Sequence, residues 1–169
     1  MARSCNLLLY GTSSDNLRKL QVAQNALARV VCQATRTCSA TELRRQLHWL
    51  PVKQCIDYKL AVLTNKARQT GSPSYLASLI SDYAPSRSLR SSDKLLLSHP
   101  YTSLVMAHKE FSVNAPKIWN DLSFNCRAAT CVNSFKRNLK HNLFHCVCSS
   151  LPVTVASCAS DSSFLLWAN

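Results

Sequence analysis

The sequence predicts a mainly α-helical protein, an irregular bundle of about five to six helices with at most a short strand or hairpin near Leu95 to Leu97. Glycine occurs only twice in 169 residues, which disfavours the many tight turns of a sheet-rich fold. Apolar residues also recur at three- and four-residue steps in several segments, as they do on one face of a helix. A chain of this length can bury one self-sufficient core.

The first predicted helix spans residues 15–33. Its stripe follows alternating three- and four-residue steps and comprises Leu17, Leu20, Gln24, Leu27 and Val31. We expect this stripe to pack in the core, because aliphatic stripes of this kind are usually buried. Residues 1–14 are expected to be a partial leader from an upstream helix.

A proline marks an elbow between the second and third predicted helices. Pro51 suits a first helical position and disfavours helical geometry in the residue before it. One helix, at 41–47, therefore ends near Leu47, and the next runs from Pro51 to a carboxyl cap at Gly71. Trp49 lies in the elbow, where we expect it to be a structural residue that fills the core, because large aromatics are mostly buried.

The middle of the chain predicts two more helical segments. Ser72-Pro73 restarts a helix with an apolar face that continues to Tyr83 and is ended by Pro85. Between residues 109 and 122 a helical face includes Trp119, which we assign a structural role. Pro116 divides that pattern and is a candidate start of a second helix.

The last clear helix is predicted at residues 131–144. Its apolar stripe comprises Val132, Phe135, Leu139 and Leu143, and basic residues crowd the other side. Residues 15–145 are therefore expected to form one helical domain. Residues 146–169 lack helical periodicity and are expected to be a poorly ordered tail.

The charge balance indicates a polyanionic partner. The formal net charge is +12, from 20 Lys and Arg against 8 Asp and Glu, and such a field attracts nucleic acid. A membrane is not expected as a partner, because the basic residues are dispersed and no apolar run approaches the roughly 18 residues of a span. Nine cysteines, an odd number, and no secretory signal predict an intracellular protein, cytoplasmic or nuclear and not secreted.

Basic residues on successive predicted helices and loops are the candidates for contact with nucleic-acid phosphates, each of which taken alone is more often a solvated surface residue. They are Arg18, Lys19, Arg44, Arg45, Lys53, Lys59, Arg87, Arg90, Lys136, Arg137 and Lys140. The expected partner is RNA or DNA held through its backbone, and no protein partner is identified.

The sequence offers little chemistry for catalysis. Its two glycines, Gly11 and Gly71, cannot form a phosphate-binding loop, and the acidic residues are scattered singly, without the pairing that two-metal chemistry needs. No cofactor is expected. No metal is expected either, although a weak zinc candidate consists of Cys126, Cys131, His141 and His145, whose spacing fits the two-Cys, two-His pattern loosely.

Several segments, taken together and in order, resemble a known family. They are CNLLLYG (5–11), LQVAQNALARVV (20–31), LHWLPVKQCIDYKLAVLTNKA (47–67), SPSYLASLISDYAPSRSLRSSDKLLL (72–97), FSVNAPKIWNDL (111–122) and SFKRNLKHNLF (134–144). This order is similar to the carboxyl-terminal region of LINE-type, jockey-like non-long-terminal-repeat retrotransposon reverse transcriptases. The resemblance covers roughly residues 5–145. It departs where the family usually has Trp-Asn-Ser-Leu-Pro and this chain has Trp119 to Ser123.

The resemblance implies a thumb and helical extension without the polymerase palm and its catalytic Asp pair. The chain is then expected to be a non-catalytic fragment of an RNA-directed DNA polymerase, with at most sequence-independent affinity for nucleic-acid backbones. Two alternatives stay open. One is a helical module, derived from a mobile element, that binds a partner protein, and the weaker one is a zinc-dependent binding module.

Overall fold

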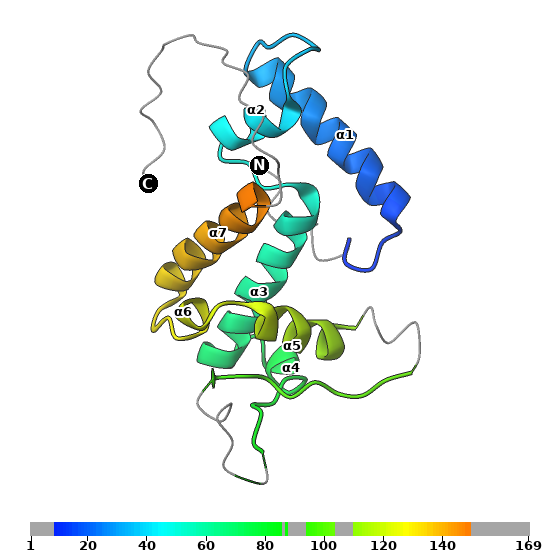
Figure 1. The fold of residues 1–169 in the computed structure, drawn as a ribbon. Coiled ribbons are helices and arrows are strands. Elements are labelled where there is room, and N and C mark those ends of the chain that lie inside the picture. The colour runs from blue at the N-terminus through cyan, green and yellow to red at the C-terminus, as the bar shows by residue number, and fades with distance from the viewer. Residues whose placement is uncertain (1–8, 86, 88–93, 104–109, 150–169) are drawn as a thin grey trace.

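The computed structural model describes residues 9–85, 87, 94–103 and 110–149. These residues contain α1 (Ser14–Val31), α2 (Ala40–Gln46), α3 (Val52–Thr70), α4 (Ser74–Ala77), α5 (Phe111–Asp121), α6 (Phe124–Arg127) and α7 (Val132–Ser149). Figure 1 shows α3 at the centre, with α7 along one side of it and α1 on the other. The predicted mainly α-helical class is confirmed, and two of the seven helices within the described residues, α4 and α6, are only four residues long.

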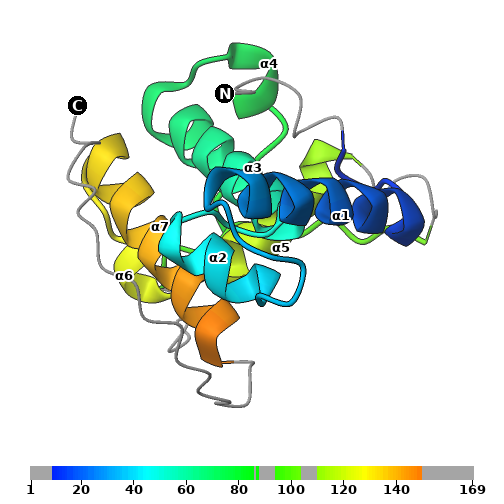
Figure 2. The same cartoon turned by 90° about the horizontal axis from the view of Figure 1, so that it is seen from above.

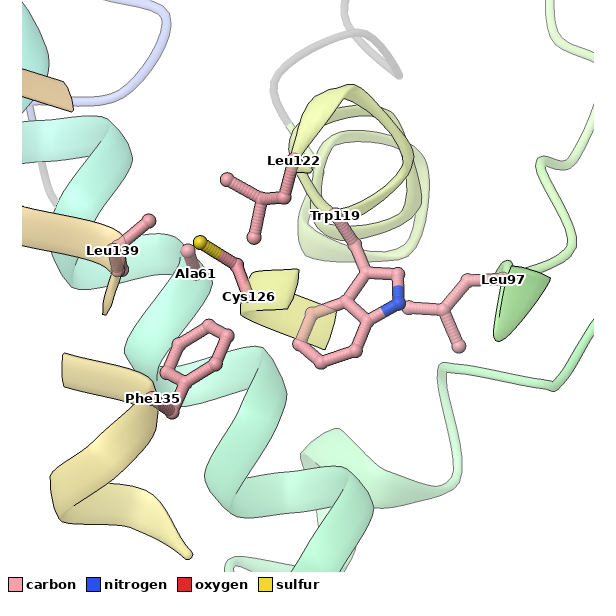
Figure 3. Packing of buried hydrophobic residues seen from close by; sticks show 7 residues of the cluster. All are labelled: Ala61, Leu97, Trp119, Leu122, Cys126, Phe135 and Leu139. Carbon is pink, nitrogen blue, oxygen red and sulfur yellow. The ribbon is translucent and has the colours of Figure 1, made fainter. Parts of the chain in front are cut away.

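The core lies where α3, α5, α6 and α7 meet (Figure 3). Its buried side chains come from each of these helices and from the segment before α5, and they are Ala61, Leu97, Trp119, Leu122, Cys126, Phe135 and Leu139. The rings of Trp119 and Phe135 stack with centroids 5.6 Å apart and an interplanar angle of 18°. The indole nitrogen of Trp119 donates a hydrogen bond to the Leu95 carbonyl at 2.9 Å, so its polar edge is also satisfied inside the core.

The segment after Pro73 does not form the helix that the sequence predicts. α4 ends after Ala77, and the chain then pairs with a distant segment in an isolated antiparallel bridge between Asp82 and Leu97. The Tyr83 amide donates to the Leu96 carbonyl at 2.9 Å, which ties the two segments together. Backbone pairing outside the helix therefore outweighs the weak apolar periodicity up to Tyr83, and the expected short extended segment near Leu95 to Leu97 is present as this bridge.

Two other predicted helix bounds change. α5 runs without interruption from Phe111 to Asp121 through Pro116, which is buried inside it, so the candidate helix start at Pro116 is wrong. A proline inside a helix removes one hydrogen bond and crowds the preceding turn, and the burial of Pro116 offsets that cost. α7 continues to Ser149, four residues into the predicted tail, and residues 150–169 of that tail lie outside the described part of the chain, as do residues 1–8 of the predicted leader.

The elbow between α2 and α3 is built largely as the proline predicts. α2 ends at Gln46, His48 has a left-handed φ of 51°, and the Trp49 amide donates to the Arg44 carbonyl at 2.8 Å. Pro51 is the N-cap of α3, with a φ of −53°. Trp49 is only half-buried, and Leu50 is the buried side chain of the elbow. The expectation that Trp49 fills the core is therefore met only in part.

α1 packs on the elbow through a polar face. The Gln24 amide donates to the Leu50 carbonyl at 2.8 Å, and the Gln21 side-chain oxygen accepts the Val52 amide at 3.0 Å. The Val52 amide, in the first turn of α3, has no backbone partner within its helix, and Gln21 supplies one. The Leu50 carbonyl also accepts the Cys55 thiol, a weak donor, at 3.2 Å, and Gln24 adds the stronger amide bond. Ala28 is the one fully buried residue of α1.

The predicted core stripe of α1 is therefore wrong in part. Leu20, Leu27 and Val31 are 38, 58 and 56% exposed, whereas Leu17 and Gln24 are half-buried. The helix is rotated so that its amides, and not its aliphatic stripe, meet the rest of the domain. Most of the predicted stripe faces solvent.

Candidate nucleic-acid interface

α7 begins at a cap that its own sequence provides. The Cys131 carbonyl accepts the Phe135 amide at 3.0 Å, and the Cys131 sulfur accepts the Ser134 amide at 3.4 Å. These bonds satisfy amides of the first turn, which have no partner within the helix. Hydrogen bonding with the side chain and the backbone of Ser134 also holds the pKa of the Cys131 thiol below its usual value.

The rotation of α7 is set by its buried stripe. Phe135 and Leu139 are 0% exposed and lie one turn apart in the core, and the partly buried Leu143 continues the stripe on the next turn. Their burial against α3 is worth about 1.5–3 kcal/mol for each fully buried side chain. The opposite side of α7 consequently faces solvent.

That opposite side is a basic face. Its exposed side chains lie at helical spacing over nearly three turns and are Lys136, Arg137, Lys140, His141 and His145. The Lys140 ammonium lies 5.8 Å from the centroid of the Phe144 ring, and the rings of His141 and His145 are 6.5 Å apart.

The basic face of α7 has no carboxylate on its own helix or on the adjoining α6. Neither α6 nor α7 contains an Asp or Glu, so no carboxylate on either helix neutralises Lys136, Arg137 or Lys140. Three cations on two successive turns of one helix match the repeated negative charge of a phosphate backbone. Because backbone phosphates are the same at every base, such a contact holds nucleic acid without reading its sequence.

Arg44 is not available for such a contact, which corrects the sequence prediction. Its side chain is buried, and the guanidinium donates to Asn25 on α1 and to Thr41 on its own helix. Burial lowers the pKa of this guanidinium. The side chain holds α2 against α1, because the packed face of α1 is polar at Asn25.

Two other predicted cations, one on α1 and one on α2, have acidic neighbours. Arg45 donates to Glu42 at 2.8 Å, and Arg18 lies 3.5 Å from Asp15. Lys19 is exposed on α1. Figures 1 and 2 show α1 and α7 on different sides of α3, so these residues do not extend the basic face.

The predicted cations of α3 lie elsewhere again. Lys53 lines a cavity of about 630 Å³ between α1, α3 and α5, which Asp57 and Lys117 also line. Burial raises the pKa of the Asp57 carboxyl, and the nearby Lys53 only partly opposes that shift. Lys59 is half-buried on α3.

The connection between α4 and α5 supplies the last two predicted cations. Arg87 is exposed, and Arg90 lies outside the described residues. The set chosen from sequence is therefore scattered over several surfaces, and only its members on α7 form a continuous face. His141 and His145 belong to that face. Their helical spacing from Lys136, Arg137 and Lys140 could have predicted that they share this face. The sequence-based prediction assigned them to the weak zinc candidate instead.

The weak zinc candidate is not assembled. Cys126 is 2% exposed within the core, whereas Cys131 is exposed at the start of α7. His141 lies ten residues after Cys131, a separation of about 15 Å along a helix at ~1.5 Å per residue. Across the described residues, no three His, Cys, Asp or Glu side chains gather as metal ligands would.

Comparisons of the chain with protein family models, curated proteins and solved structures gave no match. Among the helices of the described residues, none combines the length and the apolar character that crossing a membrane requires.

Proposed function

We propose that this chain is a non-catalytic segment of a retrotransposon RNA-directed DNA polymerase and that it binds nucleic-acid backbones, without reading their sequence, through the basic face of α7. The observation that carries the binding proposal is the continuous exposure of Lys136, Arg137 and Lys140 along α7, with no carboxylate on α7 or on the adjoining α6. The order of the segments that resemble a reverse transcriptase thumb region supports the descent.

The expected binding is weak and strongly dependent on salt. If three cations each neutralise one phosphate of a DNA duplex, log K falls with log salt at a slope of about −2.7, and affinity drops roughly 40-fold between 50 and 200 mM salt. Fluorescence anisotropy with a labelled duplex measures this slope. DNA duplexes of two unrelated sequences should bind alike.

A charge-matched pair of variants locates the interface. Replacing Lys136, Arg137 and Lys140 together by Gln should remove most of the affinity and flatten the salt slope. The control replaces three exposed cations elsewhere by Gln, namely Arg18, Lys19 and Lys66, and should reduce affinity much less. Equal losses from both triple variants would show that only the total charge of the chain matters, and would contradict an interface on α7.

The absence of polymerase activity is tested directly. The purified chain should incorporate no nucleotide on a primed RNA or DNA template, because the resemblance covers only the thumb and the region behind it. Incorporation that depends on this chain would overturn the assignment to a non-catalytic segment.

A further inference from the structure

α1 turns its polar side chains toward the rest of the domain and its aliphatic side chains toward solvent. Its polar side chains Gln21 and Gln24 form hydrogen bonds with the elbow before α3, and Asn25 accepts a hydrogen bond from the Arg44 guanidinium. Its aliphatic side chains point the other way. Leu27 and Val30 are 58 and 74% exposed.

These exposed side chains form one stripe, which we call the apolar face of α1. It follows steps of three, four, three and one residues along the exposed side and comprises Leu20, Ala23, Leu27, Val30 and Val31. Alternating steps of three and four residues are the spacing with which one helix packs along another. A contiguous exposed apolar stripe is typical of a contact surface.

The charges around this face indicate what covers it. The stretch from Ser14 to Cys38 contains four cations, Arg18, Lys19, Arg29 and Arg36, and a single carboxylate, that of Asp15. A second copy of this helix would bring the same positive charges together, which is unfavourable. A partner with carboxylates beside its apolar stripe would be attracted.

The two ends of the face offer separate places for those carboxylates. Lys19 is exposed near the start of α1. At the other end of the face, a hollow of about 650 Å³ is lined by Ala26, Arg29, Val30, Gln33, Ala34 and Arg36, so two guanidinium-bearing residues adjoin the exposed Val30. Lys19 and Arg29 are separated by ten residues, or about 15 Å along the helix.

We propose that the apolar face of α1 binds an acidic amphipathic helix of another protein, whose aliphatic stripe covers Leu20, Leu27 and Val30. Carboxylates about ten residues apart on that helix then reach Lys19 at one end and the Arg29 and Arg36 hollow at the other. Figure 1 shows α1 and α7 on different sides of α3, so the apolar face and the basic face belong to helices that lie apart. The inference is independent of the proposed binding to nucleic acid.

The test uses the full chain and a labelled synthetic helix of about 18 residues, the length of α1, with leucines at three- and four-residue steps and glutamates beside them. One control peptide has lysine in place of every glutamate, and another has the same composition with the leucine order scrambled. Fluorescence anisotropy should show binding of the acidic amphipathic peptide, and binding of each control at least about tenfold weaker. Equal affinity for the acidic and basic peptides, or no binding of the acidic one, would overturn the proposal.

A matched pair of variants places the contact on this face. Leu27→Glu should weaken peptide binding at least about tenfold, because it puts a charge in the centre of the stripe. Val22→Glu, on the same helix and 62% exposed but outside the stripe, should change binding less than about twofold. If Leu27→Glu does not fold, as judged by circular dichroism, Val30→Glu takes its place. Equal effects of the stripe variant and Val22→Glu would refute the contact.

Sedimentation equilibrium separates this partner from self-association. The chain should remain a monomer in the concentration range of the peptide titration. A dimer that Leu27→Glu dissociates would show that a second copy covers the face, and would overturn the proposal of an acidic partner.

Discussion

Replacing Trp119 by Phe should destabilise the protein because the indole does more than fill space. Its side chain is 0% exposed, and its ring nitrogen donates to the Leu95 carbonyl at 2.9 Å. Phe cannot donate that bond, and the loss of one such hydrogen bond costs about 0.5–1.5 kcal/mol. The missing ring atoms leave a cavity of roughly 40 Å³, which costs about 1 kcal/mol more at ~24 cal/mol per Å³.

The free energy of unfolding should therefore fall by about 1.5–2.5 kcal/mol, which corresponds to a decrease in Tm of about 3–10 °C for a chain of this size. Thermal unfolding followed by far-ultraviolet circular dichroism measures the shift. Trp49→Phe is the matched control, because Trp49 is only half-buried, and it should cost less than about 1 kcal/mol. Equal shifts for the two variants, or no shift for Trp119→Phe, would refute the argument from burial and hydrogen bonding.

Three further substitutions test other parts of the structure. Arg44→Gln should lower the free energy of unfolding by about 1–3 kcal/mol in urea titrations, because it removes the buried bond to Asn25, whereas Arg45→Gln, on the exposed side of the same helix, should cost less than about 1 kcal/mol. Gly71→Ala should cost about 1 kcal/mol by the same measurement, since φ at this position is 63° while no atom lies within 4 Å of the added carbon; a cost near zero would contradict the left-handed cap. Asp57→Asn should raise Tm at pH 7 and have little effect at pH 3, because burial raises the pKa of the folded-state carboxyl, so that its ionisation opposes folding once the pH rises above the unfolded value of about 3.9. A Tm gain that is the same at both pH values would contradict that origin.

Local chemistry in the sequence was enough for the helices that carry their own signals. Pro51 and Gly71 bracket α3 as predicted, because a proline favours the start of a helix and a glycine accepts the left-handed cap without strain. The stripe of Phe135 and Leu139 likewise predicted which side of α7 is buried, and with it the basic face opposite.

The scattered cations were harder to predict, because sequence spacing relates residues within one helix and not between helices. The spacing of Arg44 on its short helix predicts an exposed residue. In the structure its side chain is buried, because it donates a hydrogen bond to the Asn25 side chain on α1. Arg127, buried in α6, donates to the Asn120 carbonyl at 2.8 Å and holds the end of α5 in a similar way. Both roles depend on a partner that only the tertiary structure brings near.

The sequence by itself determined the helical class, the bounds of α3 and the inward side of α7, since caps and periodicity act over a few residues. The tertiary structure decided the rotation of α1. Its stripe of Leu20, Leu27 and Val31 predicted burial, but the carbonyl of Leu50 and the amide of Val52 needed hydrogen-bond partners that aliphatic side chains cannot supply. Gln21 and Gln24 supply them, and the aliphatic side of α1 consequently faces outward.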